Sequence, residues 1–501
     1  MGTISLGRNN TYEAVKLGHK LSTYISDIEK KDLRGNQNNA IEYMKNAGTL
    51  IDKQVHRNYY HEGFIIIGPP GTGKTFVICL GSLLYLNRKD QLKIKKNRRW
   101  DQVAIATYTN AAADRVILEF NNLFDEANVP KSTRHSLVRR ILSQEENINQ
   151  SIKDYSNTLY KPSTMSRANW LDLKNHCDAA RIFVGTIYAI RKAIKGGQTE
   201  NILKNFQPSL ILFDEASQIN ISQFNMTVYA AKKYFNAVGL IGDNSQLPPI
   251  KRIVDLKQDA LSYLSGSNGG IIKINRKTQL DIQSRMHKTI RGLSQKIGEY
   301  TLPISDYYTT QLNDLGRFNP PKSSSKEIQE LLNIGNRIIV LDNSTHPESE
   351  EIPIGTSKIN KMEAKAAKIV AKLFKECYPD MDKNEIMIIV PYKKQEEEIK
   401  DPNNYRTGTV DKFQGQEANL VIATTVRTNP DISLDFVSDL RRINVMVSRA
   451  KTKLIILNNK ETFQGNTIFE KIYDYIFKNP NEAKFINYNP ILENEIKNLI
   501  E

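Results

Sequence analysis

A glycine-rich segment directly follows a short apolar run, and it constrains the fold of this chain more than any other feature. The run is Phe64–Ile67, and the segment Gly68–Thr75 reads GPPGTGKT. A buried strand that delivers such a loop into a helix surrounds a polyphosphate with backbone N–H groups, with the lysine on the β- and γ-phosphates and the threonine hydroxyl on Mg²⁺. We therefore expect an ATP and Mg²⁺ site, rather than a structural turn, built from Gly68, Pro69, Pro70, Gly71, Thr72, Gly73, Lys74 and Thr75.

Short β-rich runs alternate with helical stretches along the chain. The first set covers 64–67, 103–106, 182–184, 210–213 and 238–241, and the second covers 337–341, 386–390, 409–410, 420–424 and 453–457. Strands that alternate with helices predict a parallel sheet wrapped by helices. We therefore expect an α/β protein with two parallel-sheet lobes in tandem.

The same pattern predicts the domain bounds. Two polar stretches interrupt the lobes: 116–180 predicts a helical insertion in the first lobe, and 300–335, with its Pro-Pro and Ser-Ser-Ser sequences, predicts an irregular insertion in the second. The full expectation is an N-terminal helical segment at 1–32, a first, ATP-binding lobe at 33–270, a second lobe at 271–460 and a C-terminal helical tail at 461–501.

The composition limits the kinds of partner and the class of protein that we expect. The 501 residues carry a formal net charge of +15, which favours a polyanionic partner such as nucleic acid. The densest basic run, Arg88–Arg99, is either a solvated loop or a phosphate contact. No apolar run approaches the ~20 residues that span a bilayer, and no secretory signal is present. With three widely spaced cysteines, we expect a soluble intracellular protein without a membrane partner.

Two adjacent carboxylates end the apolar run Leu210–Phe213. In phosphate-loop enzymes an aspartate at this position holds Mg²⁺, and a neighbouring carboxylate orients the attacking water. We assign Asp214 to the metal and Glu215 to the water; the alternative is a strand capped by surface acids. A further strand, 238–241, runs into a polar loop from which Gln246 could reach the γ-phosphate.

Two arginines stand seven residues apart late in the chain, at Arg442 and Arg449. At that spacing both project from one face of a helix. They form either a solvated helix face or a pair that neutralises charge in the transition state of ATP hydrolysis.

These motifs, in this order and spacing, resemble superfamily-1 helicases of the branch that contains the nonsense-mediated-decay RNA helicase, the tRNA-splicing and transcription-termination helicase and the Okazaki-fragment nuclease-helicase. The resemblance runs from about Leu33 to Leu457. It implies two RecA-like lobes that bind ATP and Mg²⁺ at their interface. Leu33–Ala40 resembles the family's leading glutamine motif, which implies that Gln37 reads the adenine.

The resemblance also assigns residues of the second lobe. The segment 283–287 makes Arg285 a second γ-phosphate ligand, although Ser284 stands where the family usually has a tyrosine. The segment 409–417 implies that Gln414, Gly415 and Glu417 face the nucleotide. Arg449 falls on the family's arginine finger and Arg442 on its partner. Asn360 and Glu363 have the spacing of a helix capping box.

The nucleic-acid contacts expected at strand ends and helix starts are Thr109, Asn110, Thr186, Tyr392 and Thr409. Thr109 or Asn110 also reads as a helix cap. We expect an ATP-dependent helicase or translocase on single-stranded DNA or RNA, running 5′ to 3′ as the resemblance implies. The alternatives are a nucleic-acid-stimulated ATPase that remodels complexes without unwinding, and a scaffold with a vestigial site.

The family usually carries a β-barrel before the glutamine motif. Here only 1–32 precede it, which is too short for a barrel. We therefore expect that an accessory protein supplies the missing part.

Overall fold

The computed structural model of this chain describes residues 33–48, 61–93, 101–143, 150–158, 166–169, 177, 180–195, 203, 206–232, 235–249, 259–266, 272–307, 315–321, 324–400, 405–429 and 434–500. The expected N-terminal segment, 1–32, and the end of the basic run, 94–99, lie outside these residues. The chain divides into two compact units, one of 1–244 with 248–282 and one of 245–247 with 283–501. No helix in the described part is long and apolar enough to cross a membrane.

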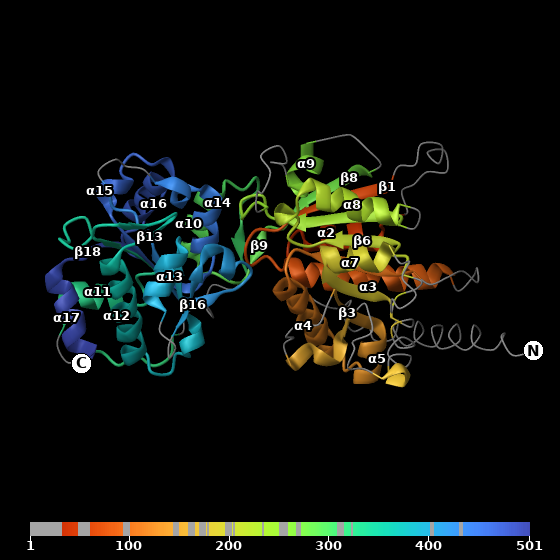
Figure 1. The fold of residues 1–501 in the computed structure, drawn as a ribbon, viewed down its shortest axis with the longest axis horizontal. Helices are drawn as coiled ribbons and strands as arrows, with labels where there is room; N and C mark the ends of the chain where they lie inside the picture. Colours follow the sequence, from red (N-terminus) through yellow and green to blue (C-terminus); the bar gives the residue numbers. More distant parts are fainter. Residues whose placement is uncertain are drawn as a thin grey trace, which may run out of the picture. The chain divides into compact units, whose positions relative to one another are not determined.

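The first unit is built on an eight-stranded sheet whose order, among the described residues, is β4-β3-β5-β2-β6-β7-β1-β8 (Figure 1). All neighbouring strands in it are parallel. The strands are β1 (His61–Ile67), β2 (Val103–Thr107), β3 (Val138–Leu142), β4 (Ser156–Thr158), β5 (Ile182–Thr186), β6 (Leu210–Phe213), β7 (Ala237–Gly242) and β8 (Ile272–Gln279). The expected parallel sheet is confirmed, and the carboxyl ends of its strands meet at one edge.

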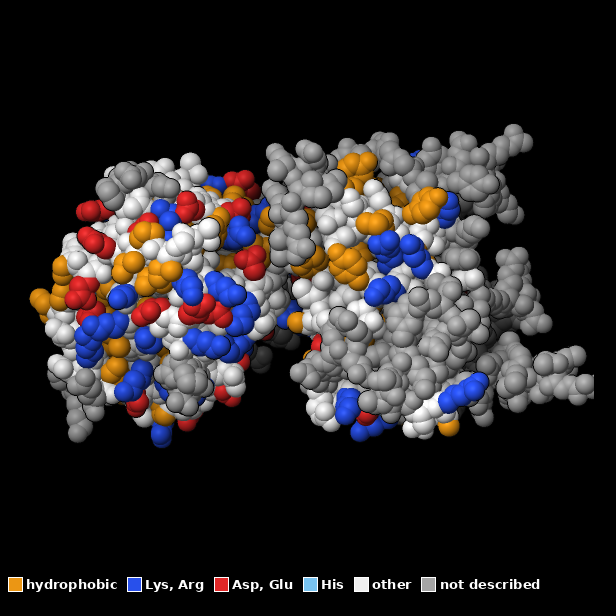
Figure 2. Space-filling view, viewed as in Figure 1, with side chains coloured by type: hydrophobic (Ala, Val, Ile, Leu, Met, Phe, Trp, Pro, Cys, Tyr) orange, Lys and Arg blue, Asp and Glu red, His pale blue; other side chains and the backbone are white. Residues whose placement is uncertain are grey.

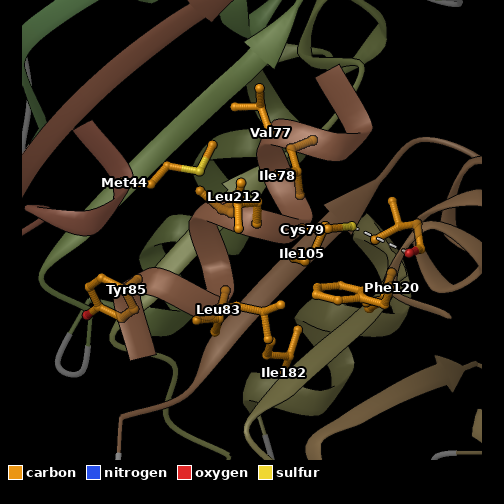
Figure 3. Close-up of a cluster of buried hydrophobic side chains, with 14 of the residues drawn as sticks. Met44, Val77, Ile78, Cys79, Leu83, Tyr85, Ile105, Phe120, Ile182 and Leu212 are labelled. Carbon is orange, nitrogen blue, oxygen red and sulfur yellow. Dashed lines mark hydrogen bonds between the residues drawn. The ribbon is translucent and has the colours of Figure 1, made fainter. Parts of the chain in front are cut away.

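Helices cover both faces of this sheet, because successive strand residues point to opposite faces and both sets are apolar. On one face Phe64 and Ile66 join α2 (Gln37–Lys45), α3 (Lys74–Lys93) and α4 (Asn110–Glu126) in the core drawn in Figure 3. On the other face Ile65 and Phe213 pack with α7 (Ile187–Lys195), α8 (Ile221–Ala231) and α9 (Ala260–Gly266). The remaining elements are α5 (Lys131–Leu137) and the 3₁₀ turns η2 (Gln150–Tyr155) and η3 (Ala216–Gln218).

The segment expected to be a helical insertion, 116–180, is only partly helical. It contains α5 and the end of α4, but it also supplies β3 and β4, which extend the sheet beyond β5. The sequence of β3, VRRIL, reads as polar, yet Arg140 is fully buried in an ion pair with Asp114 at 2.9 Å. The basic run is not a loop at its start either, since α3 continues to Lys93.

The second unit contains a six-stranded parallel sheet, of order β15-β14-β16-β17-β11-β18 among the described residues. The strands are β11 (Ile338–Asp342), β14 (Ile386–Val390), β15 (Arg406–Thr409), β16 (Ala418–Thr424), β17 (Ala450–Asn458) and β18 (Ala483–Asn487). Two short pairs, β9 (Ile282–Gln283) with β10 (Ser305–Asp306) and β12 (Ile352–Ile354) with β13 (Ser357–Ile359), complete the strands. This second RecA-like sheet is also as expected.

Two helical layers enclose the second sheet (Figure 1). One face packs against α10 (Lys288–Gly298), α14 (Leu440–Val447) and α16 (Thr467–Lys478), and the other against α11 (Lys326–Leu332), α12 (Lys361–Cys377) and α17 (Pro490–Ile500). The shorter elements are α13 (Lys393–Ile399), α15 (Lys460–Phe463), η4 (Lys383–Glu385), η5 (Val410–Phe413) and η6 (Asp435–Ser438).

The structure differs from the expected domain organisation in three places. The first unit extends to Ile282 rather than 270, because β8 pairs with β1 along its whole length. The segment 300–335 is not irregular throughout, since α11 forms within it. The segment 461–501 is not a helical tail, because β18 pairs with β11 as part of the sheet and α17 packs on the core.

Candidate nucleotide site and the arginine cluster of the second unit

The phosphate loop connects β1 to α3, as the sequence predicts. Gly71 and Gly73 have φ values of 75° and 80°, which side chains other than glycine rarely adopt. A Cβ atom on Gly68 would lie 2.1 Å from Cγ of Lys74, whose Nζ donates to the Gly68 carbonyl at 2.7 Å. The glycines therefore serve both the turn and the close passage of the lysine.

Gln37, at the start of α2, braces this loop. Its Nε2 donates to the Thr72 carbonyl at 2.9 Å, and its Oε1 accepts from the Arg34 amide at 3.1 Å. A Cβ atom on Gly73 would come within 2.8 Å of the same Nε2. Both ends of the Gln37 amide thus contact backbone in this structure, and its reading of adenine stays a prediction.

The carboxylate pair follows β6 at the same sheet edge. Asp214 is buried, and its Oδ1 accepts from the Glu215 amide at 2.9 Å. Burial, and next the charge of Glu215, raise the pKa of Asp214 to about 7, while Lys74 acts in the opposite direction. Glu215 itself has a left-handed backbone, with φ of 50°, a conformation that is costly outside glycine and that concentrates at functional sites.

The residues fit a bound divalent cation. The Glu215 Oε2 atom is buried and has no hydrogen-bond partner among the described residues. The adjacent carboxylates of Asp214, which is buried, and Glu215, which is partly buried, repel each other unless a cation compensates them. Thr75 lies in the first turn of α3, directly after Lys74, whose charge acts on Asp214. Asp214 and Thr75 would hold Mg²⁺, with the phosphates in the loop.

Three of the predicted nucleic-acid contacts lie at the same edge of the first sheet, since β2 and β5 are neighbours there. Thr109 caps α4 as expected, accepting from the Ala112 amide at 3.1 Å. Thr186 ends β5, and its hydroxyl accepts from the Ala189 amide at 3.3 Å. The Asn110 Oδ1 atom accepts from Arg140 Nη2 at 2.7 Å. Sequence reasoning missed Arg140, whose only signal is its place beside Arg139 within the short segment VRRIL.

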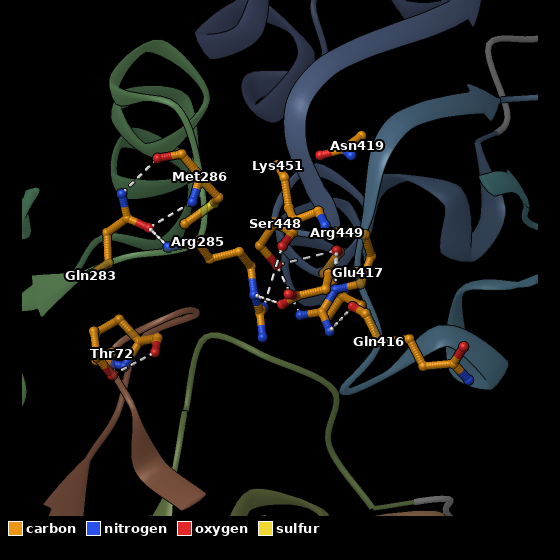
Figure 4. Close-up of polar contacts among 12 residues, drawn as sticks. Thr72, Gln283, Arg285, Met286, Gln416, Glu417, Asn419, Ser448, Arg449 and Lys451 are labelled. Atoms are coloured by element: carbon orange, nitrogen blue, oxygen red, sulfur yellow. Dashed lines mark hydrogen bonds and ion pairs between the residues drawn. The ribbon is translucent and has the colours of Figure 1, made fainter. Parts of the chain in front are cut away.

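Arg449 lies at the centre of a polar cluster in the second unit (Figure 4). Its guanidinium donates to the carbonyls of Val445 at 3.0 Å and Gln416 at 3.1 Å, and to the Ser448 hydroxyl at 3.0 Å. The fourth contact is Nη2 to Oε1 of Gln246, at 3.5 Å. The structure therefore brings Gln246 and Arg449 together, although 203 residues separate them.

The prediction that Arg442 and Arg449 share one helix face is wrong. Helix α14 ends at Val447, with Ser448 as its C-cap, and β17 begins at Ala450. Arg449 therefore lies in the turn between helix and strand, where it is 1% exposed, while Arg442 stays on the helix. The spacing rule fails because the helix ends two residues before Arg449.

Arg285 joins the same cluster. Its guanidinium forms an ion pair with Glu417, and its Nη1 donates to the Ser448 carbonyl at 3.4 Å. Figure 4 shows Arg285, Glu417 and Arg449 directed toward one another from different segments. Three residues that sequence reasoning assigned separately to the nucleotide thus form one charged group.

The other predicted nucleotide residues of the second unit lie nearby in the chain. Gly415 has a φ of 79°, and the Nε2 atom of Gln414 is buried without a hydrogen-bond partner among the described residues. The Cζ atom of Arg442 lies 5.0 Å from the ring centre of Phe436, and its Nη2 atom lies 3.7 Å from Oδ1 of Asp411. Their contacts with a nucleotide stay predictions.

The structure corrects Tyr392. Its side chain is 4% exposed within the core of the second unit, and its hydroxyl donates to Asp435 at 3.2 Å. Burial raises the pKa of Tyr392 to about 12. The side chain is therefore a packing element and is not available to a nucleic acid. Thr409, at the end of β15, is partly exposed, and its contact with a nucleic acid stays a prediction.

The predicted capping box at Asn360 forms only in part. Asn360 caps α12 and accepts from the Glu363 amide at 2.9 Å. The Glu363 carboxylate does not return to the cap. It accepts instead from the amide of Val426 at 2.8 Å and from Asn343 Nδ2 at 3.1 Å. It thereby holds the segment after β16, where Val426 has a φ of 66°.

Two protein-family models, each described as an AAA domain, match residues 52–252 and 264–461. Among curated proteins the chain is 25% identical over 461 residues to the human DNA replication ATP-dependent helicase/nuclease DNA2. This match covers 86% of the chain and 38% of the human protein. It is 26% identical over 457 residues to the yeast (Saccharomyces cerevisiae) DNA polymerase alpha-associated DNA helicase A, which covers 80% and 63% respectively.

A third relative is the Dictyostelium discoideum regulator of nonsense transcripts 1, at 25% identity over 448 residues, covering 83% of this chain and 31% of that protein. The chain therefore spans less than two thirds of the length of each of these relatives. The two family models nevertheless cover the phosphate loop, the carboxylate pair and the arginine cluster, while Gln37 and β18 lie outside the matched residues. By this agreement of motifs, fold and relatives, the chain belongs to the superfamily-1 helicases, in the branch of the nonsense-mediated-decay and Okazaki-fragment helicases.

Proposed function

We propose that this chain is an ATP-dependent helicase or translocase that moves on single-stranded DNA or RNA in the 5′-to-3′ direction. The observation that carries the proposal is the Asp214–Glu215 pair at the carboxyl edge of the first sheet, with Asp214 and one oxygen of Glu215 buried, beside the phosphate loop with its Lys74. Of the predicted nucleic-acid contacts, Thr186 ends β5 and Thr109 follows the neighbouring strand β2 at the same edge. A single sheet edge thus offers groups for both ligands.

Each residue of the nucleotide site has a defined part. Lys74 and the backbone N–H groups of the loop bind the phosphates, and Asp214 with Thr75 holds Mg²⁺, which supplies charge stabilisation at the transferred phosphoryl group when bound. The buried oxygen of Glu215 orients water and accepts its proton. Arg285 and Arg449 of the second unit supply positive charge that stabilises the transition state.

The phosphate contacts at the sheet edge are polar and uncharged, so they position the strand without reading its sequence. Alternating binding of ATP and release of its products then changes how tightly the edge holds the strand. Support for this coupling comes from the family relationship and from Gln246, which follows β7 of the first sheet and bonds to Arg449.

The test compares ATP turnover with strand displacement. We expect single-stranded DNA or RNA to raise the ATPase rate several-fold, and a duplex with a 5′ single-stranded tail to be unwound in preference to one with a 3′ tail. Turnover without displacement on either duplex would favour the remodelling ATPase instead. A turnover rate that neither nucleic acid changes would refute the motor.

Two variants tie the turnover to the site. Lys74→Ala and Glu215→Gln should both abolish hydrolysis, but only Lys74→Ala should weaken nucleotide binding, because Glu215 acts on water. Matched changes at exposed positions of the same unit, Lys131→Ala and Glu126→Gln, serve as controls and should retain the wild-type rate. Normal turnover in either site variant would overturn the assignment.

A further inference from the structure

A groove of about 550 Å³ lies between α7, α8 and α9, on the face of the first sheet opposite α3 and α4. Its base consists of Phe224, Val228, Leu264 and Ile272, which are buried. Its walls carry Met226 and Tyr229 from α8, Tyr263 from α9, and Arg191 and Lys195 from α7. The proposed nucleotide chemistry uses none of these residues.

The apolar walls are exposed to an unusual degree. Tyr229 is 66% exposed, Met226 43% and Tyr263 36%. Helices on the surface of a globular protein ordinarily carry charged residues on the outer side. Neither α8 (ISQFNMTVYAA) nor α9 (ALSYLSG) contains a charged residue. A contiguous exposed apolar patch of this kind marks an interaction site.

The rim of the groove is basic. Helix α7 contributes Arg191, Lys192 and Lys195, and the ammonium group of Lys232 lies 3.9 Å from the ring centre of Tyr229. The sequences of α7, α8 and α9 contain no aspartate or glutamate. Within the described residues, no ion pair joins Arg191 or Lys195 to a carboxylate. Figure 2 shows hydrophobic and basic side chains next to each other over α7 and α8.

The location of the groove favours a protein over a nucleic acid as its partner. Ile272 begins β8 and pairs with His61, the first residue of β1. Tyr229 lies near the end of α8, which returns the chain to the start of β7. The groove thus reaches toward the amino ends of the strands, whereas Thr109 and Thr186 lie at the carboxyl ends. A nucleic-acid strand bound along the carboxyl edge of the sheet would leave the groove free.

We propose that this groove is the docking site for a partner protein that presents an acidic amphipathic helix. Apolar side chains of that helix would enter the space between Met226, Tyr229 and Tyr263. Its acidic side chains would pair with Arg191 and Lys195, which lie one helical turn apart on α7 and so match carboxylates with a similar spacing. The site is independent of ATP hydrolysis, so its test does not depend on the proposed activity.

The probe is a fluorescently labelled synthetic helix of leucine and glutamate, and its binding to the full chain is measured by fluorescence anisotropy. A leucine–lysine helix of the same pattern and a scrambled leucine–glutamate peptide are the comparison probes. We expect only the leucine–glutamate helix to bind, with an affinity that falls as salt rises, because charge pairs at the rim of the groove are screened. Equal binding of the scrambled peptide would overturn the proposal.

Variants locate the binding. Arg191→Glu and Met226→Glu should each weaken binding about tenfold or more, because one places like charges together and the other places a charge in the apolar space. Lys131→Glu, which changes the net charge as Arg191→Glu does but lies on α5, should bind as the wild type does. All three variants should retain the basal ATPase rate. Unchanged peptide binding in both groove variants would overturn the proposal.

Two other occupants are separate outcomes. If Arg191→Glu and Tyr229→Ala weaken the binding of a single-stranded oligonucleotide as strongly as that of the peptide, the groove is a nucleic-acid surface and the proposal is wrong. If the free chain sediments as a dimer that Met226→Glu dissociates, a second copy occupies the groove, and the proposal is again wrong.

Discussion

Replacing Glu363 by glutamine should change how the stability of the second unit depends on pH. The Glu363 carboxyl is fully buried on α12 and accepts hydrogen bonds from Val426 and Asn343. Burial raises its pKa from 4.5 to about 7, outweighing those hydrogen bonds, which act in the opposite direction. Glutamine has nearly the same shape and cannot ionise, so the substitution removes the titration while leaving the packing largely intact.

The sign follows from proton binding in the two states. Between pH 4.5 and about 7 the folded state keeps the proton of Glu363 while the unfolded state has lost it. The free energy of unfolding therefore falls as pH rises through this window. The stabilising contribution of Glu363 is complete only below the pKa that the group has in the unfolded state. Each pH unit of difference corresponds to 1.36 kcal/mol, so the total is about 3 kcal/mol. The Glu363→Gln variant should lack this decrease.

Hydrogen exchange measured by mass spectrometry in increasing urea gives the assay, because peptides from α12 and β16 report the opening of the second unit alone. The difference in free energy of unfolding between variant and wild type should shift by about 3 kcal/mol in favour of the variant from pH 4.5 to 7. Glu376→Gln, at an exposed position of the same helix, is the control and should show no such shift. A difference between Glu363→Gln and wild type that is constant with pH would refute the reasoning.

Three further outcomes are expected. Arg449→Ala should leave nucleotide binding intact while turnover falls by roughly 10³–10⁵, whereas Arg442→Ala should reduce it much less; single-turnover kinetics separates the two. Arg181 is buried and bonds Asp90 through two hydrogen bonds of 2.9 and 3.0 Å; its replacement by alanine should destabilise the first unit by about 3–5 kcal/mol in urea unfolding, because the buried Asp90 carboxylate loses both of these charge-assisted bonds. Gly73→Ala should weaken ATP binding in calorimetry, because a Cβ there would press against Gln37.

The parts of the site that were predictable from sequence are those fixed by local chain geometry. A strand, a glycine loop and a helix follow one another in Phe64–Thr75, and the carboxylates come directly after an apolar strand, so neighbouring residues decide the outcome. Parallel strands then bring these loops to one edge, which places Thr109 and Thr186 there without any knowledge of the tertiary structure.

The parts that were not predictable depend on partners distant in the chain. Arg140 is buried because Asp114 and Asn110 satisfy its guanidinium, so a polar sequence became a strand. Tyr392 is buried by residues from segments distant in the chain, and its sequence neighbours do not predict this burial. Arg449 lies outside the helix because α14 ends at Val447. The exact end of a helix is the least certain feature that a sequence pattern predicts.

The position of β18 has a consequence for synthesis of the chain. Strand β11, at 338–342, lies between β17 and β18 in the sheet, so its second edge stays unpaired until residues 483–487 have left the ribosome. An apolar strand with an open edge is a template for pairing with other chains. The nascent chain therefore exposes the apolar edge of β11 until residues 483–487 are made, and during this interval β11 is open to pairing with other chains.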